Sequence, residues 1–155
     1  MFCYEYLLTP LGLLEIAASE QGLVAVTFCD KPRQLIKPQR ITQQAKQQLL
    51  AYFNQELTVF DLPLAAEGTA FQQQVWQALT TVPYGQTASY GDIAKAINNP
   101  KGVRAVGLAN GKNPIAIIVP CHRIIGANGT LTGYAGGLDK KAWLLAHEGV
   151  MGIRK

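Results

Sequence analysis

Hydrophobic and polar residues alternate along three short stretches near the start of the chain, residues 3–9, 13–19 and 23–28. Alternation with a period of two is typical of β-strands with one buried face. Turn residues such as Pro10-Leu11-Gly12 separate these stretches, so we predict three strands joined by hairpin turns. Apolar residues then recur every three to four positions over residues 41–54, which predicts an amphipathic helix.

This periodicity is lost over residues 61–68, which are rich in proline, glycine and alanine. We place a domain boundary here, with one domain at 1–65 and a second at 66–155. The first domain is expected to be a small α/β unit. Its acidic side chains are scattered and form no catalytic cluster, so we expect it to support the second domain structurally. The second domain is predicted to open with a helix from about Thr69 to Val82, where apolar residues again repeat at helical spacing.

Two short helices around a tight turn are predicted over residues 87–110. Ser89 and Asp92 resemble a capping box at the start of the first helix, with aspartate in place of the usual glutamate. Asn98-Asn99-Pro100 supplies the turn, and the second helix is expected from about Lys101. This pattern predicts a helix-turn-helix.

The second of these helices is poor in side chains that read base edges. Lys101 and Arg104 are the long polar residues between positions 101 and 109, and the small ones are Gly102, Ala105, Gly107 and Ala109. Small side chains let a helix backbone approach DNA closely but carry little sequence information, which favours shape-based or minor-groove binding. The alternative is a small-residue packing face in a protein that does not contact DNA.

One cysteine has unusual neighbours. The run Ile117–Val119 is apolar and β-branched, which predicts a buried strand, and Pro120 ends it. Cys121 comes next, followed by His122 and Arg123. A buried structural cysteine is the simpler interpretation, but proline, histidine and arginine are poor choices for a plain core strand. We therefore predict that Cys121 is a nucleophile.

A reactive thiol needs a base, and the base needs an orienting group. His122 and His147 are the two histidines of the chain, and Glu148 is one of four acids in the second domain. The sparsest assignment is a Cys121–His122–Glu148 relay. Adjacent residues of a strand point to opposite faces, so either the chain turns sharply after Pro120 or a water passes the proton. His147 fits better as a cation at a helix C-terminus.

A glycine-rich loop, residues 132–137, carries Tyr134 as its one aromatic residue. The loop does not match the phosphate-binding patterns, and a small flat ligand fits it better. We expect Asp139 to cap a last helix that ends near Glu148, where Gly149 can adopt the left-handed stop conformation.

The net charge of +4 comes from the second domain: residues 1–65 hold five basic and six acidic side chains, and residues 66–155 hold nine and four. A basic half that also holds the thiol suggests a polyanionic partner. Three widely spaced cysteines indicate a reducing compartment, the cytoplasm, and no stretch predicts a membrane span or a signal peptide. Without a CxxC or HExxH motif, we expect no metal site.

Five segments of the second domain together resemble one known family. They are Ser89-Tyr90 through Arg104-Ala105-Val106-Gly107, Asn113-Pro114, Pro120-Cys121-His122-Arg123, Tyr134-Ala135-Gly136-Gly137 and Leu145-Ala146-His147-Glu148-Gly149. In this order they are similar to the O6-alkylguanine-DNA alkyltransferases, also called methylated-DNA–protein-cysteine methyltransferases. The resemblance implies a ribonuclease-H-like N-terminal α/β domain. A mainly α, winged helix-turn-helix-like domain that carries the reactive cysteine would follow it.

The resemblance also implies roles for the matching residues. Cys121 would take the alkyl group from O6-alkylguanine irreversibly, His122 would accept its proton through water, and Glu148 would orient the imidazole. Tyr90 would donate to a ring nitrogen of the departing guanine, and Asn113 would brace the link to the thiol segment.

The resemblance implies DNA contacts as well, and Arg104 would fill the gap left by the flipped nucleotide. The residues in contact with DNA would be Ser89, Lys101, Arg104, Ala105 and Gly107. The base pocket would be built from Ile124, Tyr134 and Ala135, with the Ala135 N–H facing O6 and the carbonyls of Cys121 and Ile124 accepting from the guanine amine.

The implied partner is double-stranded DNA with alkylated bases, bound by a monomer that needs no cofactor and no membrane. Activity on O4-alkylthymine would depend on Thr132 and Ala135, in a loop where family members differ.

Three other interpretations are weaker. Alkyltransferase-like proteins bind damaged bases without repairing them, but they lack the reactive cysteine that this chain has. A cysteine hydrolase would share the thiol and the imidazole, but it would leave the helix-turn-helix unexplained. A transcription regulator would need more base-reading side chains in its second helix.

Overall fold

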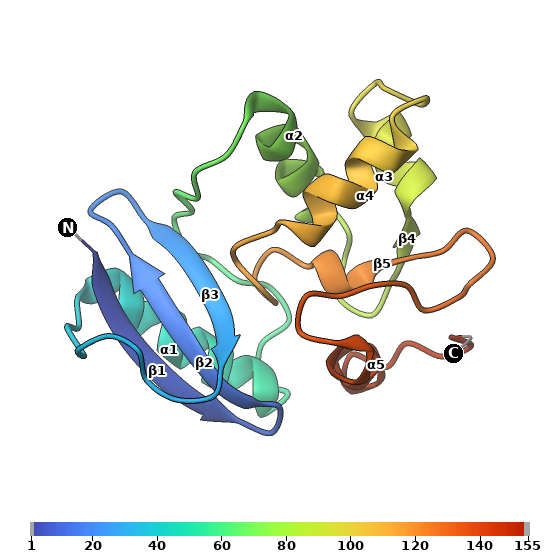
Figure 1. Ribbon diagram of the computed structural model, residues 1–155. Coiled ribbons are helices and arrows are strands. Elements are labelled where there is room, and N and C mark those ends of the chain that lie inside the picture. Colours follow the sequence, from blue (N-terminus) through green and yellow to red (C-terminus); the bar gives the residue numbers. More distant parts are fainter. Residues whose placement is uncertain (1, 154–155) are drawn as a thin grey trace. The chain divides into compact units, whose positions relative to one another are not determined.

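The computed structural model describes residues 2–153 and divides the chain into two compact units, residues 1–67 and 68–155 (Figure 1). The first unit is a sheet with one helix, and the second is mainly helical. The mixed α/β class and the order of the two parts agree with the fold expected from the sequence. Within residues 2–153 no helix has both the length and the apolar character needed to cross a bilayer.

The N-terminal unit contains an antiparallel sheet in which the strands lie in chain order. Helix α1 contacts strands β1 and β2 of this sheet (Figure 1). The core between them includes Leu14, Ile16, Leu49 and Tyr52, all without solvent exposure. The four elements are β1 (Cys3–Thr9), β2 (Gly12–Ala18), β3 (Leu23–Cys29) and α1 (Arg40–Phe53), each within about two residues of its predicted position.

Over residues 68–153, the C-terminal unit contains four helices, one short 3-10 helix and two short strands (Figure 1). Its strands pair in parallel, Ala88 with Ile124 and Ser89 with Ile125, which brings the start of α3 to the segment just after the thiol. The elements are α2 (Ala70–Leu79), β4 (Ala88–Ser89), α3 (Tyr90–Ala96), α4 (Val103–Gly111), η1 (Cys121–Arg123), β5 (Ile124–Ile125) and α5 (Leu138–His147).

Helices α3 and α4 pack on each other and form the predicted helix-turn-helix (Figure 1). The capping box at its start is confirmed: the Ser89 hydroxyl accepts from the Asp92 N–H, and the Asp92 carboxylate accepts from the Ser89 N–H. Helix α4 begins at Val103, two residues later than predicted, because the Gly102 N–H still bonds to the turn carbonyl of Asn99. The indole N–H of Trp76 in α2 donates to the Ala109 carbonyl at 2.9 Å and ties α2 to α4.

The predicted strand before the thiol is absent. Residues 116–118 form a turn, and Ile117 has a φ of 71°, an uncommon conformation for a β-branched residue. The Asn113 side chain stabilises this turn, because its amide donates to the carbonyls of Ile115 and Val119, at 3.2 and 2.8 Å. The burial of the segment was predicted correctly, since Ile115, Ile117, Ile118 and Val119 are all buried.

The predicted cap of the last helix is also wrong. Gly137 occupies the N-cap position of α5 with a φ of 102° and no side-chain cap, and Asp139 lies inside the first turn. A left-handed glycine can end the loop where a side chain would be strained. The predicted stop at the other end is confirmed, because Gly149 has a φ of 83°.

Candidate active site

The thiol lies at the first residue of a 3-10 turn rather than on a strand. Pro120 precedes η1, and the Arg123 N–H bonds back to the Pro120 carbonyl at 3.0 Å. The chain therefore turns sharply after Pro120, one of the two alternatives that the sequence left open. Cys121 is 7% exposed and His122 is fully buried, so the turn holds both side chains inside the unit.

Glu148 and two consecutive basic residues form a buried cluster. The imidazole Nε2 of His122 lies 2.7 Å from one Glu148 oxygen. Arg123 donates from its Nε to the other oxygen at 2.8 Å and from a terminal nitrogen to the first at 3.1 Å. Another guanidinium nitrogen of Arg123 donates to the Val82 carbonyl at 2.7 Å. The carboxylate thus orients the imidazole, and Arg123, which we had not placed in the site, holds the carboxylate.

The protonation state of His122 follows from this geometry. Burial lowers the pKa of His122, while the bond to Glu148 acts in the opposite direction. The neutral ring therefore predominates at pH 7. Because a carboxylate can only accept, the proton lies on Nε2 and leaves Nδ1 as an acceptor. Within residues 2–153 this buried Nδ1 has no hydrogen-bond partner.

The thiol itself is held mostly protonated by its surroundings. Burial raises the pKa of Cys121, whereas a hydrogen bond from the Asn113 side chain and the positive charge of Lys141 lower it. Asn113, which stabilises the turn before the thiol, therefore also favours its charged form. A buried thiol beside a neutral imidazole can pass its proton to that base as it attacks.

Two of the residues expected in the base pocket, Tyr134 and Ala135, lie in the loop before α5. The hydroxyls of Tyr90 and Thr132 are hydrogen-bonded at 2.7 Å, so the start of α3 is linked to this loop. The Tyr134 hydroxyl is buried without a partner among the described residues. Ala135 is exposed, and its N–H makes no hydrogen bond within residues 2–153, which leaves it available to a ligand.

The two carbonyls expected to bind the guanine amine already accept other bonds. The Cys121 carbonyl accepts from the Ile124 N–H, and the Ile124 carbonyl accepts from the Lys141 ammonium. A carbonyl oxygen has two lone pairs, so each can accept one more donor.

Lys141 was missed in the sequence, although the helical pattern contains a signal for it. It is fully buried on α5, on the same face as Leu144, Leu145 and Glu148. Positions 141, 144, 145 and 148 follow the spacing of a core stripe. A lysine in such a stripe is unusual, because lysines are almost never fully buried unless they are paired.

The predicted DNA contacts lie on and beside α4. Arg104 and Ala105 are exposed on this helix, and Lys101 is exposed in the turn before it. Gly107 lies under the Tyr90 ring, since a Cβ built there would be 3.8 Å from that ring. Ser89 pairs with Ile125 in the short sheet, and its hydroxyl accepts from the Asp92 N–H as the cap of α3.

The remaining candidates lie elsewhere or have other contacts. His147 stacks on Trp143, with ring centroids 4.8 Å apart, in the last turn of α5. Cys3 and Cys29 are free thiols at the ends of strands β1 and β3. Among residues 2–153 there is no group of three His, Cys, Asp or Glu side chains that could hold a metal ion.

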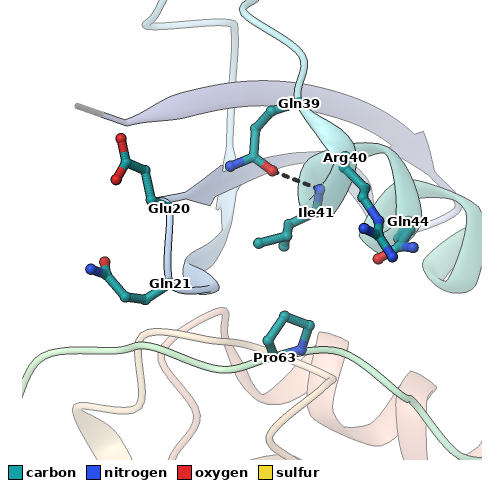
Figure 2. A pocket seen from close by; sticks show the side chains of 7 residues that line it. All are labelled: Glu20, Gln21, Gln39, Arg40, Ile41, Gln44 and Pro63. Atoms are coloured by element: carbon teal, nitrogen blue, oxygen red, sulfur yellow. Dashed lines mark hydrogen bonds between the residues drawn. The ribbon is translucent and has the colours of Figure 1, made fainter.

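A groove of about 610 Å³ lies on the N-terminal unit (Figure 2). Its lining is mostly amide and aliphatic, and the Gln39 side chain there accepts from the Ile41 N–H at 2.6 Å. The residues that line this groove include no thiol or imidazole. The lining residues are Glu20, Gln21, Gln39, Arg40, Ile41, Gln44 and Pro63.

Comparison with known proteins identifies relatives along the whole chain. Residues 2–66 match the ribonuclease-like domain of the 6-O-methylguanine DNA methyltransferases, and residues 70–150 match their DNA binding domain. The methylated-DNA–protein-cysteine methyltransferase of Methanosarcina acetivorans is 53% identical over 152 residues, which cover 94% of this chain and 97% of that protein.

Two solved structures from Mycobacterium tuberculosis are similar in fold. The crystal structure of its O6-methylguanine methyltransferase has a TM-score of 0.86 at 48% identity and covers 96% of this chain and 93% of that one. Its OGT in complex with DNA also has a TM-score of 0.86, at 50% identity, with 94% and 91% covered. On these matches the chain belongs to the 6-O-methylguanine DNA methyltransferase family.

Proposed function

We propose that this protein repairs DNA by transferring the alkyl group of O6-alkylguanine to Cys121, once and irreversibly. The observation that carries the proposal is the buried Cys121 next to His122, whose ring is oriented by Glu148 at 2.7 Å, in the unit that also holds the helix-turn-helix. Relatives named as methylated-DNA–protein-cysteine methyltransferases support the same activity.

The transfer is a single displacement. Cys121 loses its proton to Nδ1 of His122 through a water, and the thiolate attacks the alkyl carbon. The S–C bond forms while the C–O6 bond breaks, and the electron pair of that bond goes to the guanine. Tyr90 donates its hydroxyl proton to a ring nitrogen of the leaving guanine, which leaves as a normal base. The proton taken up by His122 then returns through water to the Tyr90 oxygen, so both side chains end neutral. The thioether has no route back, so each molecule reacts once.

The substrate is double-stranded DNA, bound by one protein molecule. A buried thiol cannot reach a base inside a duplex, so the damaged nucleotide must be flipped out at a cost of a few kcal/mol. Arg104 is exposed on α4 and makes no hydrogen bond or ion pair within residues 2–153, so it is free to fill the gap in the stack. Ala105 and Gly107 let the helix backbone approach the groove.

The test is mass spectrometry after incubation with a duplex that contains a single O6-methylguanine. We expect the peptide that holds Cys121 to gain the mass of one methylene, stoichiometrically and only once. Cys121→Ser is the control, and it should bind the duplex without being modified. Tight binding of damaged DNA by the wild type with an unmodified Cys121 would instead identify a damage-recognition protein. Loss of both effects would contradict the proposal altogether.

A further inference from the structure

Thr132 has no part in the transfer as described above, yet its hydroxyl is bonded to one of the reacting side chains. Its Oγ1 lies 2.7 Å from the hydroxyl oxygen of Tyr90, and within residues 2–153 this is the one hydrogen bond of that hydroxyl. The two residues are 42 positions apart, at the start of α3 and in the loop before α5. The fold, and not local chain geometry, therefore brings the two hydroxyls together.

The backbone of Thr132 is held independently of its hydroxyl. The Lys141 ammonium donates to the Thr132 carbonyl at 2.9 Å and also to the carbonyl of Ile124. Thr132 itself is half-buried. These main-chain bonds place the Thr132 side chain beside Tyr90 whichever of the two hydroxyls donates, and they do not depend on the residue type at position 132.

The direction of the bond between the hydroxyls must change when a base is bound. A hydroxyl has one proton to donate and can also accept, and in the free protein either oxygen can be the donor. Once the Tyr90 proton is directed at a ring nitrogen of the guanine, it is no longer available to Thr132. The bond then persists only if Thr132 donates to the Tyr90 oxygen. That oxygen gains negative charge as its proton passes to the leaving base, and a donor that is already in place stabilises such charge most effectively.

We propose that Thr132 is a positioning residue for the departure of guanine: its hydroxyl donates to the Tyr90 oxygen, directs the Tyr90 proton to the base and stabilises the phenolate that forms. The O–H bond of Thr132 does not break. The Tyr90 proton goes to the ring nitrogen as the C–O6 bond breaks, and the Tyr90 oxygen regains a proton from His122 through water. This inference rests on the proposed function, because it supplies a partner for the Tyr90 step of that reaction.

The first experiment measures single-turnover transfer from a duplex with one O6-methylguanine, at saturating protein. Thr132→Val keeps the shape of the side chain but loses the donor, so we expect the rate to fall about tenfold, the loss typical of one hydrogen bond to a charged group. Thr132→Ser keeps the hydroxyl and should restore most of the lost rate. Thr130→Val is the matched control in the same loop and should leave the rate unchanged, because the Thr130 hydroxyl makes no hydrogen bond within the described residues.

A double-mutant cycle tests whether the effect passes through Tyr90. The Tyr90→Phe protein lacks the oxygen to which Thr132 would donate. Adding Thr132→Val to that protein should therefore cause no further loss of rate. An equal loss in both backgrounds would mean that Thr132 acts independently of Tyr90, and it would overturn the proposal.

Alkylation of Cys121 by iodoacetamide separates the leaving group from the thiol. Iodide leaves as a stable anion and needs no proton, so this reaction depends on the thiol and on access to it. Mass spectrometry of the peptide that holds Cys121 should give the same rate for the wild type and for Thr132→Val. A slowing as large as that of the transfer from DNA would assign the effect to the thiol or to access, and would contradict a role at Tyr90.

The outcomes separate this inference from the proposed function. If the wild type transfers the methyl group and a folded Thr132→Val protein does so equally fast, the role of Thr132 is wrong and the proposed function stands. If the wild type fails to transfer, the proposed function is wrong and the role of Thr132 falls with it. Circular dichroism shows whether each variant is folded, and Thr132→Ala, which also lacks the donor, takes the place of the valine variant if that one is not.

Discussion

Both units of this protein bury carboxylates, but the charged partners of these carboxylates are exposed in one unit and buried in the other. In the N-terminal unit, Glu15 accepts from the Tyr6 hydroxyl at 2.7 Å and from the exposed Arg33 at 3.0 Å. Glu5 accepts from Thr42 at 3.1 Å, with Lys46 at 3.7 Å. In both cases the charged partner lies at the surface and is partly solvated. Such networks tie strands to loops and helices and leave little free capacity for chemistry.

The C-terminal unit keeps both the carboxylate and its charged partner away from water. Glu148, His122 and Arg123 are all buried, and the cluster still leaves the His122 Nδ1 unpaired. The other buried side-chain atoms without partners among the described residues, the Tyr134 hydroxyl and Asn110 Oδ1, belong to the same unit. Satisfied polar groups maintain a structure, whereas buried unsatisfied ones call for a functional explanation. The predictions below test whether this difference separates structure from chemistry.

The largest effect is expected from Glu148→Gln. The amide would leave Arg123 buried without its counter-charge, so we expect a loss of about 3–5 kcal/mol in the free energy of unfolding. It would also present a donor toward Nε2 of His122 and disturb the tautomer, so transfer should fall roughly 100-fold or more. Urea unfolding and single-turnover kinetics measure the two effects.

The matched variant in the other unit is Glu15→Gln. Its charged partner, Arg33, is largely exposed, and an exposed ion pair stabilises little. We expect a smaller loss of stability and an unchanged rate of transfer. Equal losses of transfer in the two variants would mean that the Glu148 cluster is no more important for catalysis than the Glu15 cluster.

Arg104→Ala should have the next largest effect, and on flipping rather than on affinity. Without the side chain that fills the gap, we expect transfer to fall about tenfold or more, because unstacking costs a few kcal/mol. Binding to undamaged duplex should weaken much less. A fluorescent base analogue at the target position reports flipping, and a mobility shift reports affinity. Lys101→Ala is the control, expected to weaken binding uniformly and to lower its salt dependence. Equal loss of flipping and of nonspecific affinity in Arg104→Ala would contradict its role.

The sequence predicted elements well where local chemistry decides them. Alternation located β1 to β3, helical spacing located α1, and the Ser89–Asp92 pair located the start of α3. It failed where hydrogen bonds from a side chain decide the backbone. Nothing in a run of β-branched residues indicates that the Asn113 amide will take the carbonyls of Ile115 and Val119 and convert a strand into a turn.

The site shows the same division. The Cys121–His122–Glu148 relay could be proposed from residue types, because so few bases and acids were available. Arg123 and Lys141 could not, since their importance comes from burial and from carbonyls that are distant in sequence, such as those of Val82 and Thr132. A lysine in an apolar helical stripe was the one signal present in advance.

A smaller effect is expected on folding stability when the pH is lowered, because His122 is buried in its neutral form. Because burial lowers the pKa of His122, the folded protein binds a proton at this ring less readily than the unfolded chain does, with its ordinary value near 6.5. Stability is therefore full above pH 6.5 and is lost as the pH falls below it, by at most about 1.4 kcal/mol per pH unit. Urea titrations between pH 5 and 8 measure this loss, and His122→Asn should remove this part of it. A wild type that is equally stable at pH 5 and pH 7, with the asparagine variant following the same curve, would refute a buried neutral imidazole.

The smallest effect, and the most direct comparison of the two units, comes from removing one tyrosine hydroxyl from each. The Tyr134 hydroxyl is buried without a partner among residues 2–153, so Tyr134→Phe removes a desolvation cost and should stabilise the protein by about 1 kcal/mol. Transfer should nevertheless slow by a few fold, because a polar atom near Cys121 and Glu148 is lost; the charges of both act on its pKa.

Tyr6→Phe should behave in the opposite way. The Tyr6 hydroxyl donates to Glu15 and accepts from the Arg33 and Gln34 N–H groups, at 3.0 and 2.9 Å. Its removal leaves those groups unpaired and should cost about 2 kcal/mol of stability, with no change in transfer. The two variants should therefore shift stability in opposite directions in thermal unfolding, and only Tyr134→Phe should slow single-turnover transfer. If both variants lose stability and neither loses rate, the Tyr134 hydroxyl has only a packing role, and an unpaired buried atom in this fold does not identify a functional one.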